Sequence, residues 1–165
     1  MYHALDNHEI NRLLSAHSAT KNIYKGFLYP RDEKLPKISP PALYVVNTDY
    51  LNGPGLHWVL ILFLRDKTIF VDPFGLSPDV HDFPLAVERI NNPVTYNIFT
   101  VQNFTTRSYS CGHFVILYAI LLSQGFTLKN IETFFTKDTE LNDNIATDVV
   151  TWLFDSMNLM TKIST

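Results

Sequence analysis

The 165-residue sequence predicts a single α+β domain spanning residues 1–165. Strand-like patterns cluster between residues 42 and 102, and helical patterns lie before and after them. The composition is that of a globular chain able to bury a sizeable core, with 46% hydrophobic, 13% aromatic and 18% charged residues. Since repeats, low-complexity tracts and linkers are all absent from the sequence, we expect one sheet packed against helices.

The first expected element is an amphipathic helix that begins at Asp6. Glu9 follows three residues later, as in a capping box, and apolar residues recur at helical spacing from Ile10. Residues 24–36 are punctuated by proline, which disfavours a helix. They predict an extended stretch that forms either the lip of a groove or a loop.

Three strands are expected next, over residues 42–48, 56–64 and 68–75. The second is an almost continuous apolar run, typical of a central strand. A tight turn joins it to the third strand, which predicts an antiparallel hairpin. In that hairpin His57 and Asp72 lie at the same edge of the sheet.

The remainder of the chain is expected to be mostly helical. Residues 77–92 predict a loop with a short helix, and residues 94–102 predict a further strand. An apolar helix begins at Cys111 and ends at Gly125, and a short helix capped by Thr127 follows. One face of the last helix is apolar and is interpreted as core packing: Ile145, Val149, Trp152, Leu153, Ser156, Met157 and Met160.

Cys111, the single cysteine, is the candidate nucleophile. At a helix N-terminus the macrodipole favours the thiolate form. Ser108 and Ser110 are suitable N-caps, and Gly112 leaves no side chain where a substrate carbonyl would approach. The alternative is a buried structural cysteine, which is the commoner state of a free thiol.

A cysteine nucleophile needs a base, a group that orients the base, and donors for the oxyanion. His57 suits the first role, Asp72 the second, and the Gln102 amide with the Cys111 backbone N–H the third. Each has a simpler alternative: a strand histidine, a turn-forming aspartate and a surface glutamine. His113 is interpreted as structural or cleft-lining, and the spacing identifies no partner for His81.

The composition argues against a disulfide framework, a metal site and a membrane-spanning segment. One cysteine permits no internal disulfide, which fits a reducing compartment or a virion interior. The histidines show no zinc spacing, so we expect no metal and no cofactor. The apolar runs are too short to span a membrane, and no signal peptide is expected.

The charge of the chain bears on contact with nucleic acid. A net charge of −3 gives no overall electrostatic attraction for nucleic acid. A local basic cluster predicts a solvated face, with a polyanion contact as the alternative: Lys21, Lys25, Arg31, Lys34 and Lys37.

The order of the motifs resembles that of the adenovirus proteinase (adenain) family. The motifs are Gly-Leu-His-Trp at residues 55–58, Val-Asp-Pro-Phe-Gly at 71–75, Val-Gln at 101–102 and Ser-Cys-Gly at 110–112. Related SUMO and ubiquitin-like-specific proteases share this order. The resemblance implies a papain-like α+β cysteine endopeptidase whose central mixed, mainly antiparallel sheet packs against the Cys111 helix and flanking helices.

The resemblance also implies a narrow cleft that selects glycine before the scissile bond. Trp58 would wall this subsite, with Gly55 and Gly112 beside the substrate, although Trp58 is equally well explained as a core residue. Residues 27–36 would supply another wall by pairing with an extended substrate. The implied substrates are viral structural precursors, processed in the virion and the infected host cell. Nothing in the sequence suggests an obligate assembly, so we expect a monomer.

Two departures from adenain affect the expected partners and site. Asp72 replaces a glutamate, and Gln102 lies nine positions before Cys111, farther than in adenain. With Cys111 as the sole thiol, an activating peptide would not be disulfide-tethered, and DNA contact is left open. Two alternative functions are a protease acting on host ubiquitin or SUMO conjugates and a catalytically silent protein that binds a capsid or host protein.

Overall fold

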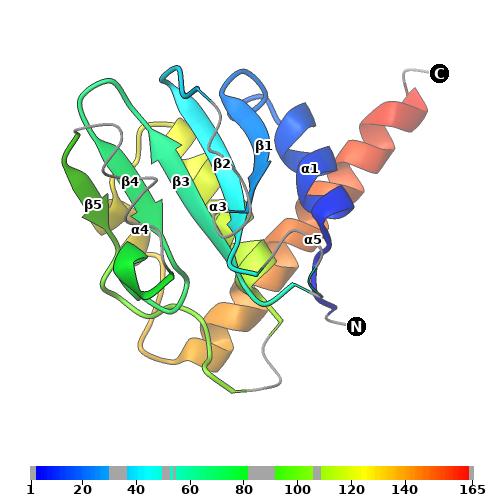
Figure 1. The fold of residues 1–165 in the computed structure, drawn as a ribbon. Coiled ribbons are helices and arrows are strands. Elements are labelled where there is room, and N and C mark those ends of the chain that lie inside the picture. The colour runs from blue at the N-terminus through cyan, green and yellow to red at the C-terminus, as the bar shows by residue number, and fades with distance from the viewer. Residues whose placement is uncertain are drawn as a thin grey trace.

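The computed structural model describes residues 3–29, 37–49, 53, 55–81, 92–105 and 109–163, and these build a five-stranded sheet with helices on one face (Figure 1). Strand order follows chain order: β1 (Tyr24–Leu28), β2 (Ala42–Asn47), β3 (Trp58–Phe63), β4 (Thr68–Val71) and β5 (Val94–Tyr96). The central pairings, β2–β3 and β3–β4, are antiparallel, whereas the edge pairings β1–β2 and β4–β5 are parallel. The predicted α+β class and the predicted hairpin are confirmed.

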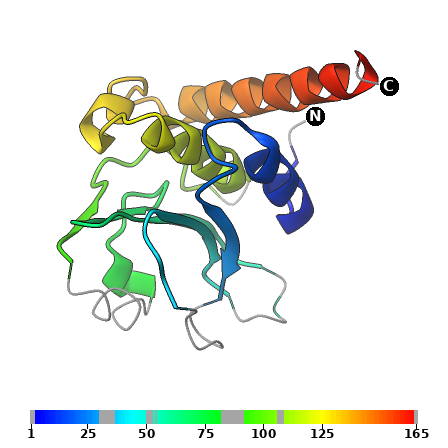
Figure 2. The same cartoon turned by 90° about the horizontal axis from the view of Figure 1, so that it is seen from above.

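The helices are α1 (Asn7–Ala16), α3 (Cys111–Ser123), α4 (Leu128–Glu132) and α5 (Thr139–Ile163), with a 3-10 helix η1 at Pro78–His81. Seen from above, α1, α3 and α5 lie on the same side of the sheet (Figure 2). The capping box predicted at Asp6 is present, with the Asp6 carboxylate accepting from the Glu9 backbone N–H. Gly125 follows α3 with a φ of 90°, as expected of a residue that ends a helix.

Strand β3 is apolar throughout because the sheet is buried on both faces. Leu60 and Leu62 belong to the main core between the sheet and the helices, whereas Val59 and Ile61 belong to a second core on the opposite face. Successive side chains of a strand alternate between faces, so burial on both sides removes the usual polar alternation. The predicted central strand is therefore confirmed, and β3 has a neighbour on each side that fixes its position.

Strand β5 is shorter than predicted, ending at Tyr96 rather than Gln102. The Asn97 side chain accepts from the Asp72 backbone N–H at 2.9 Å and donates to the Asp72 carbonyl at 2.6 Å. These side-chain bonds replace the backbone ladder beyond β4. The chain from residue 97 onward is consequently a loop, and Gln102 lies on that loop.

The apolar face predicted for the last helix is half wrong. Val150 is fully buried, and Leu153 and Met157 pack against the core. In contrast, Val149, Trp152 and Met160 are exposed. Apolar residues occupy two faces of this helix, so periodicity alone did not identify the one that meets α3. Residues 30–36 and Ser108, to which the sequence assigned a groove lip and an N-cap, lie outside the described residues.

Candidate active site

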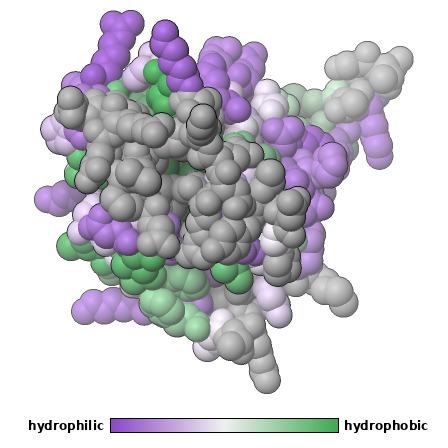
Figure 3. All heavy atoms as spheres, viewed as in Figure 1, coloured by the Kyte–Doolittle hydropathy of each residue, from purple (hydrophilic) through white to green (hydrophobic). Residues whose placement is uncertain are grey.

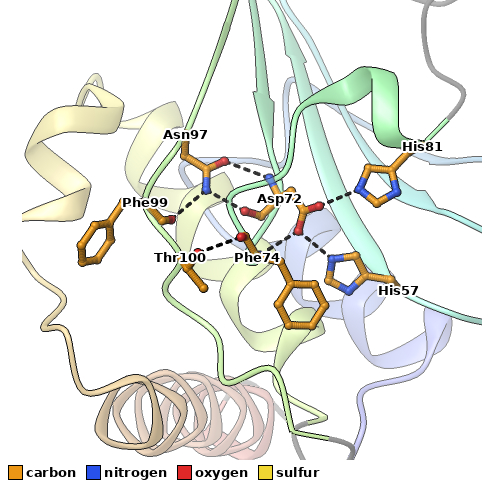
Figure 4. Close-up of polar contacts among 7 residues, drawn as sticks. All are labelled: His57, Asp72, Phe74, His81, Asn97, Phe99 and Thr100. Atoms are coloured by element: carbon orange, nitrogen blue, oxygen red, sulfur yellow. Dashed lines mark hydrogen bonds and ion pairs between the residues drawn. The ribbon is translucent and has the colours of Figure 1, made fainter.

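His57 and Asp72 meet at one edge of the sheet, as the predicted hairpin requires. His57 immediately precedes β3 and Asp72 immediately follows β4. Because these strands are antiparallel, the start of one adjoins the end of the other. The His57 Nε2 atom lies 2.8 Å from Asp72 Oδ1 (Figure 4).

Asp72 is completely buried, and its carboxylate is held at both oxygens. Besides His57, Oδ1 accepts from the Phe74 backbone N–H at 2.8 Å, and Oδ2 lies 2.6 Å from His81 Nε2. Burial alone would raise the pKa of Asp72, but the hydrogen bonds from His57 and His81 outweigh it and lower the pKa to about 2. Asp72 is therefore ionised at neutral pH and able to orient an imidazole.

His57 is hydrogen-bonded to Asp72 and lines the same cleft as Cys111. Burial would lower the pKa of His57, but hydrogen bonding to Asp72 and to Cys111 reverses this effect and raises the pKa to about 9. A carboxylate can only accept, so Nε2 carries the hydrogen of this bond and Nδ1 is the ring nitrogen that Asp72 does not contact. The Phe74 ring stacks on the imidazole with centroids 4.6 Å apart, which restricts its rotation.

Cys111 is the first residue of α3 and is partly exposed. Ser110 occupies the N-cap position, as predicted, but its side chain makes no capping bond. The Ser110 hydroxyl instead donates to Asp143 Oδ1 on α5 at 2.8 Å, and the same oxygen accepts the Asn103 backbone N–H at 3.2 Å. Asp143 thus ties together both ends of the loop that leads into Cys111.

Gln102 is buried and borders the same cleft as Cys111. Its backbone N–H donates to the Pro73 carbonyl at 3.1 Å, which places it next to the His57–Asp72 pair. The alternative of a surface strand residue is wrong, since Gln102 is 1% exposed and follows β5. Its role as an oxyanion donor stays a prediction.

A cleft of about 580 Å³ runs past these side chains. Gly55 and Trp58, predicted beside the substrate, border it together with Phe74. Trp58 also packs against the hydrophobic core. Its Nε1–H donates to the Leu5 carbonyl at 3.1 Å, and its ring packs on Phe27. Both interpretations of Trp58 therefore hold in part.

The two predicted glycines play different structural roles. Gly55 has a φ of 84°, a conformation that favours glycine, and its N–H donates to Asp49 at 3.0 Å. Gly112 is buried, and a Cβ there would lie 3.0 Å from the Leu5 Cβ and 3.5 Å from the Trp58 ring. Gly112 thus permits close packing of the N-terminal segment on α3.

Sequence reasoning missed two contributors to this region. His81 contacts Asp72, although nothing in its spacing indicated that η1 would bring it there. Residues 4–7, which precede and open α1, also border the cleft, because Leu5 packs over Gly112. Neither His81 nor residues 4–7 belong to a recognisable motif, so their place at the site follows only from the tertiary structure.

Exposed apolar side chains also occur on the loop that follows β5. Phe104 is 63% exposed and stacks on Phe74 with centroids 4.4 Å apart, and Ile98 is 78% exposed. Both belong to the loop that follows β5, and Figure 3 shows a hydrophobic area low on the face of the molecule where this loop runs. The stack of His57, Phe74 and Phe104 connects the loop to the imidazole.

Among the described residues, no group of three or more His, Cys, Asp or Glu side chains has the arrangement of a metal site. Within the same part of the chain, every helix is too short or too polar to cross a bilayer.

No protein-family model and no curated protein matches this chain. Solved structures do match, among them the ASFV pS273R protease, with 19% identity and a TM-score of 0.44. The aligned region covers 64% of this chain and 43% of that protease. A likeness at this level carries no inference about function, which therefore rests on the geometry of the site.

Proposed function

We propose that the protein is a cysteine endopeptidase. The observation that carries this proposal is the hydrogen bond between His57 and Asp72, with His57 and Cys111 lining one cleft. A buried carboxylate, an imidazole with a raised pKa and a thiol at a helix N-terminus are the groups that an acyl transfer to sulfur requires.

In the proposed reaction, His57 holds the thiol proton as an imidazolium while Cys111 Sγ attacks the scissile carbonyl carbon. The carbonyl electron pair moves to oxygen, where the Gln102 amide and the Cys111 N–H donate hydrogen bonds. Collapse of this intermediate expels the amine, which takes the proton from His57 and leaves a thioester. Water, deprotonated by His57, then hydrolyses the thioester and regenerates the thiol.

The proposed substrate is a polypeptide with glycine before the scissile bond. Gly55 and Trp58 border the cleft beside Cys111, which supports a narrow subsite there. The resemblance to adenain-like proteases further suggests viral structural precursors as substrates, in the virion and the infected cell. We propose that the enzyme acts as a monomer.

The test compares Cys111→Ala and His57→Ala with the control His8→Ala, which changes an exposed histidine on α1. Cleavage of a peptide library with glycine at the scissile position is measured, with circular dichroism to verify folding. We expect His57→Ala to lower kcat/KM by about 10²-fold or more, Cys111→Ala to abolish cleavage, and the control to match the unmodified protein.

Retained cleavage in folded Cys111→Ala would rule out this mechanism. A ubiquitin or SUMO probe carrying a C-terminal electrophile is included in the same experiment. Capture of such a probe through Cys111, without cleavage of any library peptide, would replace the proposed endopeptidase with a protease for ubiquitin-like conjugates.

A further inference from the structure

A second histidine contacts the buried carboxylate that orients His57. His81 Nε2 lies 2.6 Å from Asp72 Oδ2, and its side chain is 11% exposed against 0% for Asp72. The reaction proposed above does not use His81. It comes from η1, an element outside the β3–β4 hairpin that brings His57 and Asp72 together.

The two oxygens of the Asp72 carboxylate have different hydrogen-bond partners. His57 and the Phe74 backbone N–H share Oδ1, whereas His81 is directed at Oδ2 (Figure 4). A carboxylate held at one oxygen can still turn about its Cβ–Cγ bond. A strong bond at the second oxygen opposes that rotation, because a charge-assisted hydrogen bond between a ring N–H and a carboxylate is short and directional.

The surroundings of Asp72 offer little substitute for this contact. The described side chains that face it are His57 and His81, while Asn97 binds the backbone of Asp72 and leaves the carboxylate alone. Because Asp72 is fully buried, bulk solvent does not reach its carboxylate in the folded protein. The His81 ring also packs near His57 and Phe70, at 6.1 and 6.2 Å between centroids, so its position is well defined.

We propose that His81 is a positioning residue that holds the Asp72 carboxylate in the orientation that His57 requires. The inference rests on the proposed function, since its consequence is a correctly aligned His57–Cys111 pair. Loss of the donor at Oδ2 lets the carboxylate rotate, weakens its bond to His57 Nε2 and lowers the reactivity of Cys111 that an aligned His57 supports. The effect on activity is therefore transmitted through Asp72.

The test uses substitutions that separate hydrogen bonding from packing. His81→Gln keeps an N–H donor close to the place of Nε2, whereas His81→Leu fills a similar volume without a donor. His81→Asn, whose amide is too short to reach Oδ2, is the polar counterpart of the leucine variant and keeps the test decisive if His81→Leu does not fold. His8→Leu is the matched histidine control.

Two quantities are measured: kcat/KM on a glycine-containing peptide, and the rate of Cys111 alkylation by iodoacetamide from pH 5 to 9. We expect His81→Leu and His81→Asn to lower kcat/KM by roughly 10- to 100-fold, the size expected for one charge-assisted hydrogen bond. Alkylation at acid pH should slow in the same variants. His81→Gln should stay within about threefold of the unmodified protein on both measures, as a retained donor predicts.

The alkylation profile separates this inference from the proposed function. If no peptide is cleaved but Cys111 alkylation depends on both His57 and the donor at residue 81, the endopeptidase proposal fails and the role of His81 stands. An alkylation profile that is identical in all His81 variants overturns the inference. Equal losses in His81→Gln and His81→Leu overturn it as well, because hydrogen bonding would then not be what residue 81 contributes.

Discussion

Asp72 illustrates how a buried charge is kept ionised by its neighbours. An isolated carboxylate taken out of water would be neutral, because burial disfavours the charged form. Here His57, His81 and the Phe74 N–H supply three donors to a side chain with no exposed surface. Breaking such a pair at one partner costs more than the pair itself contributes, since it leaves a buried charge uncompensated.

The pKa shifts of His57 and Asp72 predict that this pair contributes to the stability of the fold in a pH-dependent way. The pKa of His57 is raised from 6.5 to about 9, so its contribution is complete below pH 6.5 and is lost as pH rises through 9. The pKa of Asp72 is lowered from 3.8 to about 2, so its contribution is present above pH 3.8 and is lost as pH falls through 2. The pair should therefore stabilise the folded protein most between pH 3.8 and pH 6.5, where both contributions are complete.

We therefore expect His57→Gln to lower the free energy of unfolding by on the order of 2 kcal/mol at pH 5.5 and by much less at pH 9.5. Urea unfolding of both proteins at the two pH values measures the difference. A destabilisation that is as large at pH 9.5 as at pH 5.5 would show that the imidazolium–carboxylate pair is not its source.

At the scale of elements, the site depends on how α5 meets the start of α3. The Asp143 carboxylate accepts from Ser110, the residue before Cys111, and from Asn103, the residue after Gln102. One acceptor on α5 therefore holds the two ends of the segment that connects Gln102 to Cys111. Gln102 lies nine positions before Cys111, and both border one cleft while Asp143 binds the two ends of the segment between them.

Replacing Asp143 by alanine removes that acceptor from both ends of the segment. We expect Asp143→Ala to lower the free energy of unfolding by about 1–2 kcal/mol and to reduce kcat/KM, because Gln102 and Cys111 lose their fixed separation. Asp143→Asn keeps an acceptor oxygen and should behave nearly like the unmodified protein. Urea unfolding and peptide cleavage measure both effects.

The control for this prediction is Asp148→Ala, an exposed substitution on the same helix, for which a change within about 0.5 kcal/mol is expected. An Asp143→Ala variant as active and as stable as Asp148→Ala would show that the loop is held by other contacts.

At the scale of the whole molecule, the cleft is assembled by parts distant in sequence. The N-terminal segment, the β3–β4 hairpin, the loop after β5 and the start of α3 all border it. This single chain supplies Asp72, His57 and Cys111, with His57 bonded to Asp72 and lining the cleft together with Cys111. The net charge of −3 provides no general attraction for DNA.

We therefore expect peptide cleavage by the chain alone. Added double-stranded DNA should change the rate less than about threefold, and raising salt from about 50 to 200 mM should have a similarly small effect, because few phosphate contacts are available to lose. Initial rates with and without DNA at both salt concentrations measure this. A large, salt-sensitive increase on adding DNA would show that a polyanion completes the site.

Local patterns in the sequence determined much of the fold and of the candidate site. The capping box at Asp6, the apolar run of β3 and the start of α3 at Cys111 follow from neighbouring residues, whose preferences act over a few positions. The hairpin required no long-range information, and it was enough to place His57 beside Asp72. These features were predictable because their physical causes are contained within short segments.

Other features were decided only by tertiary structure. The end of β5 depends on Asn97 binding the backbone of Asp72, and the buried face of α5 depends on which side meets α3. The approach of His81 to Asp72 depends likewise on the path of η1. Each is a contact between segments whose separate preferences do not specify a partner, so the sequence alone identified the hairpin pair while packing decided what surrounds it.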